Sequence, residues 1–362
     1  MASLMKKVGI LNFQYSTHNY GAVLQAAALE HICKQLGHEA LHLDYRARPK
    51  KTLKGRAGQL LRTLGLRKPA EKNQVANEQA FERFRQDFIH RTPRINSPKE
   101  FFAIAQELDA TIVGSDQVWR PSFAKDAIAF ALGYVPQGVD RIAYAASFGT
   151  ATWEQAEDDR LTNAVKRELQ QFKAISCREE SGLEICRDVF GVMAEHVLDP
   201  LLLVDDFFFE KVLTKSSTNP HARLVYYKLD STQEFLEDLA GVGDLMNAEA
   251  VNIYLKTSEI HEYREVPDWL ALIRNSEVVV TDSFHCICLA LRFGKEVIFC
   301  PNEHRGQTRL DSLFRKLDIA REPLTVRGKA PMFKLVPRTD IGRVLDHERV
   351  HSKAFLVSAL NG

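Results

Sequence analysis

The sequence predicts an α/β fold of two Rossmann-like lobes, each built on a parallel sheet, with a cleft between the lobes. Three observations predict it. A length of 362 residues suits two domains. Predicted strands and helices alternate along most of the chain, and this alternation breaks once, near the middle. The composition, with 45% hydrophobic and 26% charged residues, is that of a globular protein and excludes a disordered or collagen-like chain.

The first lobe is predicted over residues 6–200. Its strands are continuous Val/Ile/Leu runs, typical of parallel strands covered on both faces. Its helices place apolar residues at helical spacing, as in 22–36, where Gly37 marks the end. The predicted strands are 7–13, 38–45, 110–114, 141–148 and 174–177, followed by a closing segment at 196–200. The predicted helices are 22–36, 73–90, a short one that begins at 97–98, 153–172 and 181–190.

An interdomain linker is predicted at 201–222, where the alternation gives way to a Phe cluster and then a Ser/Thr/Asn/Pro stretch. The second lobe then covers 223–362 and includes a C-terminal tail. Its predicted strands are 223–229, 250–255, 278–281 and 296–299, and its predicted helices are 233–246, 267–274 and 283–293.

The chain carries features of a cytoplasmic protein. It shows no secretory signal pattern and no apolar window long enough to span a membrane. None of its six cysteines form a C-x2-C pair, so we expect buried free thiols rather than a zinc site.

The net charge of +1 hides a basic insertion at residues 46–72, with ten Lys and Arg residues against one acid, Glu71. The rest of the chain has 38 basic and 46 acidic residues, which argues against a nucleic-acid binder. Apolar residues within the insertion recur at helical spacing. A basic amphipathic helix of this kind is typical of a membrane-surface element or a partner-docking helix, and a solvated insertion fits as well.

Ligands of open parallel sheets bind beyond the carboxyl ends of the strands, so the residues that follow each strand are the candidates. Ser283 follows strand 278–281 and suits the N-cap of the next helix, whose free amide groups form an anion site. His285, in the first turn, would then face the cleft. The competing interpretation is a capping serine beside a solvent-facing histidine.

Cations also follow the predicted strands. Arg178 follows strand 174–177 and suits a bidentate clamp on a phosphate or carboxylate, although an ion pair with Glu179 or Glu180 explains it too. Lys228 and Arg309 add cations near strand ends of the second lobe, where simple solvation is an equal explanation.

Polar and aromatic residues after two strands of the first lobe are candidates for binding a sugar. A Trp face exposed there would let a sugar ring stack, whereas a Trp in the core fits the sequence equally well. These candidates are Asn19, Tyr20, Ser115, Gln117 and Trp119.

Taken together and in this order, several segments resemble the polysaccharide pyruvyl transferase family, whose fold is similar to that of GT-B glycosyltransferases. The resemblance covers roughly residues 7 to 320. It is carried by VGILNF at 8–13, NYGAVLQ at 19–25, VGSDQVW at 113–119, AASFG at 145–149, SCRE at 176–179 and VTDSFH at 280–285.

The resemblance implies transfer of the pyruvate moiety of phosphoenolpyruvate onto two hydroxyls of a sugar in a polysaccharide or its lipid-linked precursor, forming a pyruvate ketal and releasing phosphate. Arg178 and His285 match family positions associated with donor binding and catalysis. Many members carry Arg where this chain has Ser283, so we expect Arg309, Arg305 or Lys228 to supply that cation, unless the donor pocket itself differs.

A mechanism consistent with these residues uses His285 as a general acid, since an imidazole beside a polyanion stays protonated near neutral pH. The acid protonates the methylene carbon of the donor, and Asp116 or Glu179 takes the proton of the attacking hydroxyl. No step requires a metal or a redox cofactor. Lipid-linked acceptors would place the protein at the inner membrane face, with residues 46–72 as the contact.

Two rival functions fit the same architecture. One is a GT-B glycosyltransferase that uses a sugar nucleotide. The other is a non-catalytic envelope-assembly adaptor whose donor site has decayed, an interpretation that Ser283 in place of the family Arg favours.

Overall fold

The computed structural model describes residues 4–46, 75–228, 230–256, 261–302, 307–326 and 330–362. The amphipathic segment that the sequence places within 46–72 lies outside the described residues except for Arg46, so its membrane role stays a prediction. Arg305 also lies outside the described residues. Within the described residues, no helix is both long and apolar enough to cross a membrane. All six cysteines are free and buried, as predicted.

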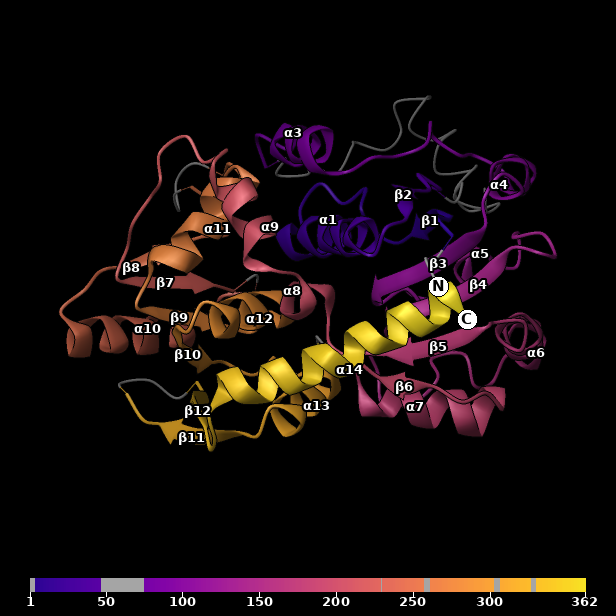
Figure 1. Ribbon diagram of the computed structural model, residues 1–362. Helices are drawn as coiled ribbons and strands as arrows, with labels where there is room; N and C mark the ends of the chain where they lie inside the picture. The colour runs from indigo at the N-terminus through magenta and orange to yellow at the C-terminus, as the bar shows by residue number, and fades with distance from the viewer. Residues whose placement is uncertain (1–3, 47–74, 229, 257–260, 303–306, 327–329) are drawn as a thin grey trace, which may run out of the picture.

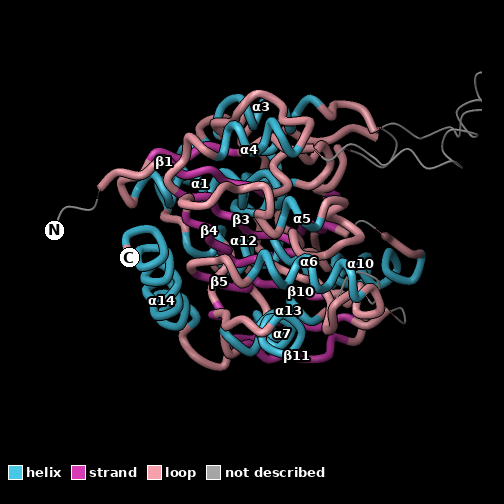
Figure 2. The backbone as a smooth tube through the Cα atoms, turned by 90° about the vertical axis from the view of Figure 1, so that its right-hand side faces the viewer, coloured by secondary structure: helices cyan, strands magenta, loops and turns pink. Residues whose placement is uncertain are grey.

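The first lobe is built on a fully parallel six-stranded sheet of order β2-β1-β3-β4-β5-β6. Helices cover both of its faces (Figures 1 and 2), α1 and α14 on one side and α4 to α6 on the other. The strands are β1 (Lys7–Leu11), β2 (Glu39–His42), β3 (Ala110–Asp116), β4 (Asp140–Ala146), β5 (Ala174–Cys177) and β6 (Glu195–His196). The helices are α1 (Tyr20–Gln35), α3 (Gln79–Phe88), α4 (Pro98–Ala105), α5 (Ala127–Phe130), α6 (Asp159–Leu169) and α7 (Glu180–Ile185), which continues as a π-helical turn (Cys186–Phe190).

The second lobe has a six-stranded sheet of order β11-β12-β10-β9-β7-β8. Its strands β7 to β10 are parallel, whereas β12 runs antiparallel to both β10 and β11. The strands are β7 (Leu224–Tyr227), β8 (Ala250–Asn252), β9 (Val278–Thr281), β10 (Glu296–Phe299), β11 (Ile319–Leu324) and β12 (Met332–Pro337). The helices are α10 (Gln233–Met246), α11 (Val266–Asn275), α12 (Phe284–Arg292), α13 (Thr308–Lys316) and α14 (Ile341–Asn361).

The predicted fold class is confirmed: the protein has two Rossmann-like α/β lobes, each built on a largely parallel sheet. The sequence did not reveal the antiparallel edge formed by β11 and β12. The predicted C-terminal tail ends in α14, which packs on the first lobe, where Ser352 Oγ accepts a hydrogen bond from Leu198 N at 2.9 Å. The lobe boundaries stay a prediction.

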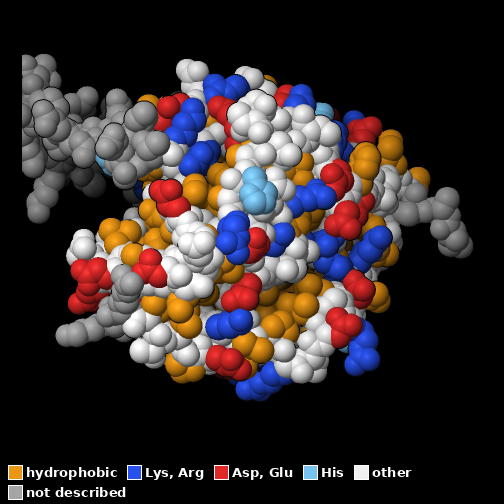
Figure 3. Space-filling model, turned by 90° about the vertical axis from the view of Figure 1, so that its left-hand side faces the viewer, with side chains coloured by type: hydrophobic (Ala, Val, Ile, Leu, Met, Phe, Trp, Pro, Cys, Tyr) orange, Lys and Arg blue, Asp and Glu red, His pale blue; other side chains and the backbone are white. Residues whose placement is uncertain are grey.

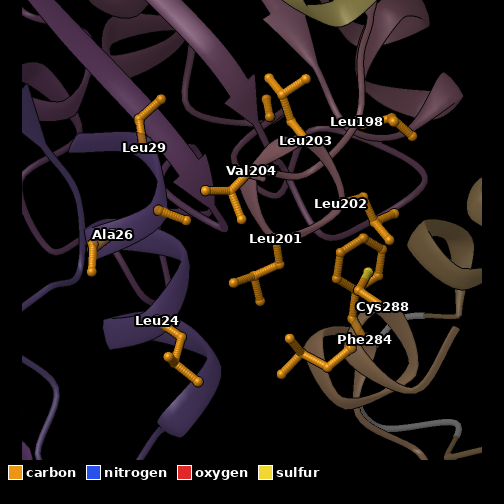
Figure 4. Close-up of a cluster of buried hydrophobic side chains, with 14 of the residues drawn as sticks. Leu24, Ala26, Leu29, Leu198, Leu201, Leu202, Leu203, Val204, Phe284 and Cys288 are labelled. Carbon is orange, nitrogen blue, oxygen red and sulfur yellow. The ribbon is translucent and has the colours of Figure 1, made fainter. Parts of the chain in front are cut away.

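The predicted linker, 201–222, carries structure as well. It holds most of α8 (Pro200–Leu203) and all of α9 (Asp206–Leu213), because its Leu and Phe side chains pack into the core. The side chains of α8 lie between those of α1 and α12, which belong to different lobes (Figure 4). One hydrophobic cluster therefore runs through both lobes and holds them together.

The protein surface mixes charges of both signs. Figure 3, which shows the left-hand side of Figure 1, has Lys and Arg beside Asp and Glu instead of a patch of one sign. This mixing accords with a net charge of +1.

Replacing Leu201 with Ala tests the shared core. Leu201 is fully buried in α8, so Leu201→Ala should lower the free energy of unfolding by about 2–5 kcal/mol, measured by urea denaturation. Leu245→Ala is the control, because Leu245 of α10 is 74% exposed and should change stability by less than about 0.5 kcal/mol. Equal losses in the two variants would show that α8 is not part of a core common to both lobes.

Candidate active site

A cavity of about 760 Å³ opens between the two lobes. Its walls come mainly from loops that follow β1, β3, β7 and β9, so the carboxyl ends of both sheets face it. Two other surface hollows, about 610 Å³ beside α10 and about 510 Å³ beside α14, lie away from these strand ends. The cavity between the lobes is therefore the candidate site.

The amino-terminal end of α12 forms part of the cavity wall. Ser283 is its N-cap, as predicted, and its hydroxyl accepts from Cys286 N at 3.5 Å. Thr281 Oγ1 accepts from Ser283 N at 3.0 Å and fixes the turn between β9 and the helix. The helix dipole and the first amide groups give this turn a partial positive charge at the cavity.

His285 lies in the first turn of α12 and is only 5% exposed, so it is not a solvent-facing residue. Its Nε2 is 3.2 Å from Arg178 Nη1 and 3.6 Å from Asp199 Oδ2. On the other lobe, Gly21 approaches it so closely that an added Cβ would lie 2.4 Å from the imidazole Cγ and Nδ1. A larger residue at 21 would displace the ring, so Gly21 helps to set its position.

Arg178 is buried between two carboxylates. Its Nη1 donates to Asp199 Oδ2 at 3.0 Å, and its Nη2 donates to Asp116 Oδ1 at 3.1 Å. Asp199 Oδ2 also accepts from Ser115 Oγ at 2.8 Å, while its Oδ1 caps α8 by accepting from Leu201 N. The positive charge of Arg178 is therefore balanced within the protein.

These contacts hold both carboxylates ionised. Burial raises the pKa of Asp199, but His285 and Arg178 lower it by more, so it lies well below its usual range. Burial also raises the pKa of Asp116, and Arg178, His285 and Arg309 together outweigh that effect and lower it. The cluster is thus a set of compensated charges that spans both lobes.

Arg309 of α13 supplies a second guanidinium, on the cavity wall itself. Burial, and then the charge of Arg178, lower its pKa to about 10, so it stays positively charged near neutral pH. Both arginines pack against the Phe284 ring, with Cζ at 4.5 Å for Arg178 and 5.8 Å for Arg309. Phe284 therefore places two cations beside His285.

The backbone at the carboxyl ends of β3 and β4 adopts unusual conformations. Ser115, Asp116 and Ala145 have φ angles of 24°, 79° and 50°, in a region that L-residues rarely occupy. Ser176 Oγ supports the irregular part of β4 by accepting from Ala145 N at 3.1 Å. Strain of this kind gathers at functional sites, where the surrounding structure compensates for it.

The structure brings together six of the predicted site residues around the cavity and leaves the others behind its wall. Those on the wall are Asn19, Asp116, Gln117, Ser283, His285 and Arg309. Arg178 and Ser115 lie behind the cavity wall, next to His285 and Asp199. Lys228 also lies behind the wall, and its Nζ donates to the Asp282 carboxylate at 3.3 Å. Glu179, the other expected base, is fully buried and accepts from Phe148 N and Gly149 N.

Two predicted sugar-binding residues instead serve the core. Trp119 is 4% exposed and donates through Nε1 to Phe130 O at 3.0 Å, so its ring offers no face to the cavity. Tyr20 stacks on Trp269 of the other lobe with ring centroids 4.8 Å apart, and its hydroxyl accepts from Arg264 N. Tyr20 therefore joins the lobes.

Sequence reasoning missed Asp199. It also missed three aromatic residues that line the cavity, Phe13, Tyr15 and Phe123. Asp199 follows β6 and precedes Pro200, so its position after a strand end was the available signal. Within the described residues, no group of three or more His, Cys, Asp and Glu side chains is placed to hold a metal ion.

A sequence model of the polysaccharide pyruvyl transferase family matches residues 19–304. The chain belongs to this family. The match covers α1, the strands β2 to β10 and the α12 turn, so the family region includes His285, Arg178 and Asp199. No curated protein matches the sequence.

Solved structures similar to this pyruvyl transferase family member share little sequence with it. A proposed UDP-N-acetylglucosamine 2-epimerase from Listeria monocytogenes is 14% identical, with a TM-score of 0.48 over 99% of this chain and 92% of that one. A UDP-GlcNAc 2-epimerase from Methanocaldococcus jannaschii is 10% identical, with a TM-score of 0.47 over 84% and 87%. An Escherichia coli heptosyltransferase is 12% identical, with a TM-score of 0.37 over 83% and 91%. We draw nothing about activity from them.

Removing the charge of Asp199 tests the buried cluster. Asp199→Asn should lower the free energy of unfolding at pH 7 by about 3–5 kcal/mol, because Arg178 loses a buried partner. The pKa of Asp199 is lowered in the folded protein. Its contribution is therefore complete above the unfolded value of about 3.9 and is lost as pH falls below it, so the difference between the two proteins should shrink there.

The matched control is Asp188→Asn, since Asp188 and its partner Arg187 are each 60% exposed. That change should leave the free energy of unfolding nearly unchanged at any pH, because solvent screens an exposed ion pair. Urea denaturation across the pH series gives both results. A loss in Asp199→Asn no larger than in Asp188→Asn would show that the cluster does not stabilise the fold.

Proposed function

We propose that this chain transfers the pyruvate moiety of phosphoenolpyruvate onto two hydroxyls of a sugar in a polysaccharide or its lipid-linked precursor, forming a pyruvate ketal and releasing phosphate. One observation carries the proposal. His285 lies on the wall of a large cavity, beside the positive end of α12 and the guanidinium of Arg309. An acid beside an anion site is what protonation of a phosphorylated enol requires.

We assign binding of the donor's phosphate and carboxylate to Arg309 and the α12 turn. Phosphoenolpyruvate carries a phosphate and a carboxylate, which need donors at fixed positions. Arg178 is behind the wall and already bonded to Asp116 and Asp199, so it acts as a positioning residue for His285. Ser283 caps the turn where many relatives carry Arg, and Arg309, on the same Phe284 ring as Arg178, supplies a cation close by.

The first chemical step is protonation of the donor's methylene carbon by His285. A sugar hydroxyl then attacks the neighbouring carbon and forms the first C–O bond. The second hydroxyl attacks the same carbon as phosphate leaves, which closes the ketal. Of the two hydroxyl protons released, one restores His285 and the other leaves with phosphate, so the balance is complete. Asp116, on the cavity wall, is the group placed to relay a hydroxyl proton.

Arg178 and Asp199 hold His285 in place. Its Nε2 lies 3.2 Å from Arg178 Nη1, and the same guanidinium nitrogen donates to Asp199 Oδ2 at 3.0 Å. A general acid held in place contributes about 10²–10⁴-fold to turnover.

The donor and the acid are tested together. Phosphoenolpyruvate should raise the melting temperature of the wild-type protein, whereas UDP-glucose and UDP-N-acetylglucosamine should not. His285→Gln should keep most of the phosphoenolpyruvate shift, but phosphate release with methyl β-hexopyranosides as surrogate acceptors should fall by about 10²–10⁴-fold. His347→Gln is the control, because His347 is 82% exposed on α14.

A second variant tests whether the position of the His285 ring matters, and not only its presence. Gly21→Ala leaves His285 in the chain but displaces its imidazole, so phosphate release should fall by about 10²-fold. A shift with UDP-sugars in place of phosphoenolpyruvate would favour a glycosyltransferase. Full turnover in His285→Gln would remove this histidine from the mechanism.

A further inference from the structure

We propose that Phe13, Tyr15 and Phe123 form a binding site for a neutral hexose ring of the acceptor. These three residues, called the aromatic wall below, line the first-lobe side of the cavity. The inference rests on the proposed function, because it names the acceptor class for the same cavity.

Phe123 is the strongest member of the aromatic wall. Its side chain is 51% exposed although it lies on a cavity wall. Arg120 covers part of the ring, with Cζ 4.6 Å from the ring centroid. The rest of the ring is open to the cavity and is free to contact a ligand there.

The loop that carries Phe123 is held rigidly. Arg120 donates to Glu154 at 2.6 Å and to Gln117 Oε1 at 3.1 Å. Ser122 donates to Glu154 through its backbone N at 3.0 Å and its hydroxyl at 2.9 Å. An exposed aromatic ring on a loop fixed in this way is preorganised for a partner.

Phe13 and Tyr15 extend the aromatic wall from the loop after β1. The Phe13 ring packs edge-to-face on Tyr15, with centroids 6.1 Å apart, and on Phe130 at 5.2 Å. Burial raises the pKa of Tyr15 to about 12, so its hydroxyl is neutral near pH 7 and can donate and accept hydrogen bonds. The aromatic wall thus combines apolar faces with a neutral hydroxyl, which suits a pyranose with its apolar C–H face and its hydroxyl rim.

The second lobe contributes polar groups to the same cavity. Asp230 and Asp282 line it, and Asn302 Nδ2 donates to both carboxylates, at 3.3 and 3.0 Å. Carboxylates accept hydrogen bonds from sugar hydroxyls. Asp282 directly precedes Ser283, so hydroxyls bound there would lie next to the α12 turn.

Charge favours a neutral ring over a nucleotide. The described residues of the cavity wall include two guanidinium groups, and Arg309 is assigned to the donor. Arg120 is bonded to Glu154 and Gln117 beneath Phe123, so it does not suit a diphosphate. A volume of about 760 Å³ is in the range that holds drug-sized ligands. It therefore has room for a hexose ring beside a three-carbon donor.

Saturation-transfer NMR on the full chain tests the aromatic wall directly. The probes are methyl β-D-galactopyranoside, methyl β-D-glucopyranoside and methyl β-D-mannopyranoside, with methyl β-D-glucuronide and uridine diphosphate for comparison. Irradiating aromatic protons of the wild type should transfer saturation to the ring C–H protons of at least one neutral glycoside. Phe123→Ala should weaken that binding by about tenfold, and Phe123→Trp should retain it.

Phe102→Ala is the matched control, because Phe102 is an exposed phenylalanine of the first lobe, on α4, that does not line the cavity. It should leave glycoside binding unchanged. The proposal is overturned if no neutral glycoside receives saturation in the wild type, if Phe123→Ala binds as the wild type does, or if the glucuronide or the nucleotide is preferred.

The phosphoenolpyruvate melting shift, measured on the same samples, separates this proposal from the proposed function. If glycoside binding depends on Phe123 but phosphoenolpyruvate does not shift the melting temperature, the sugar site is supported and phosphoenolpyruvate is rejected as the donor. A phosphoenolpyruvate shift without glycoside binding would keep the donor and reject the aromatic wall.

Discussion

The site depends on one buried interaction, the guanidinium of Arg178 held between Asp199 and Asp116 and in contact with His285 of the other lobe. Charges this deeply buried are tolerated only when each has a partner with good geometry. Here the partners come from the ends of β3, β5 and β6 and from the start of α12. The ion pairs of Arg178 all lie within the first lobe, and its contact with His285 crosses to the second, so the cluster positions this ring at the interface between the lobes.

The shared hydrophobic core makes this arrangement possible. Asp199 caps the short helix α8, whose side chains lie between those of α1 and α12, so a residue that contacts His285 also caps the segment that joins the lobes. Tyr20 adds a second connection by stacking on Trp269. The position of His285 and the packing between the lobes therefore rest on neighbouring residues, and Gly21 of α1 lies close against the His285 ring.

Features with a local signal could be predicted from the sequence. The Val run of β9 and the capping Ser283 are such signals, and the resemblance to the family pointed to His285 and Arg178. The burial of Trp119 could not be predicted, because it depends on Phe130 O and on a core assembled from several elements. The hydrogen bond between Asp199 and Ser115 joins residues that are 84 positions apart, and no local sequence pattern encodes such a contact. The helical linker was missed for two reasons. All four residues of α8 are buried, so it shows no apolar stripe, and the exposed Phe207 beside the buried Phe208 and Phe209 obscures the stripe of α9.

A rigid pair of lobes also constrains how substrates enter. Because the core continues through α8, the cavity does not depend on a wide separation of the lobes, and both substrates would approach through its open side. Under the proposed function, the anion would be held at Arg309 and α12, whereas the exposed ring of Phe123 offers contact without charge. Because the donor site is cationic and the acceptor site is an uncharged aromatic surface, the small donor would not occupy the acceptor position. A sugar that is one unit of a long chain could then dock a single ring against Phe123 while the rest of the polymer stays in solvent.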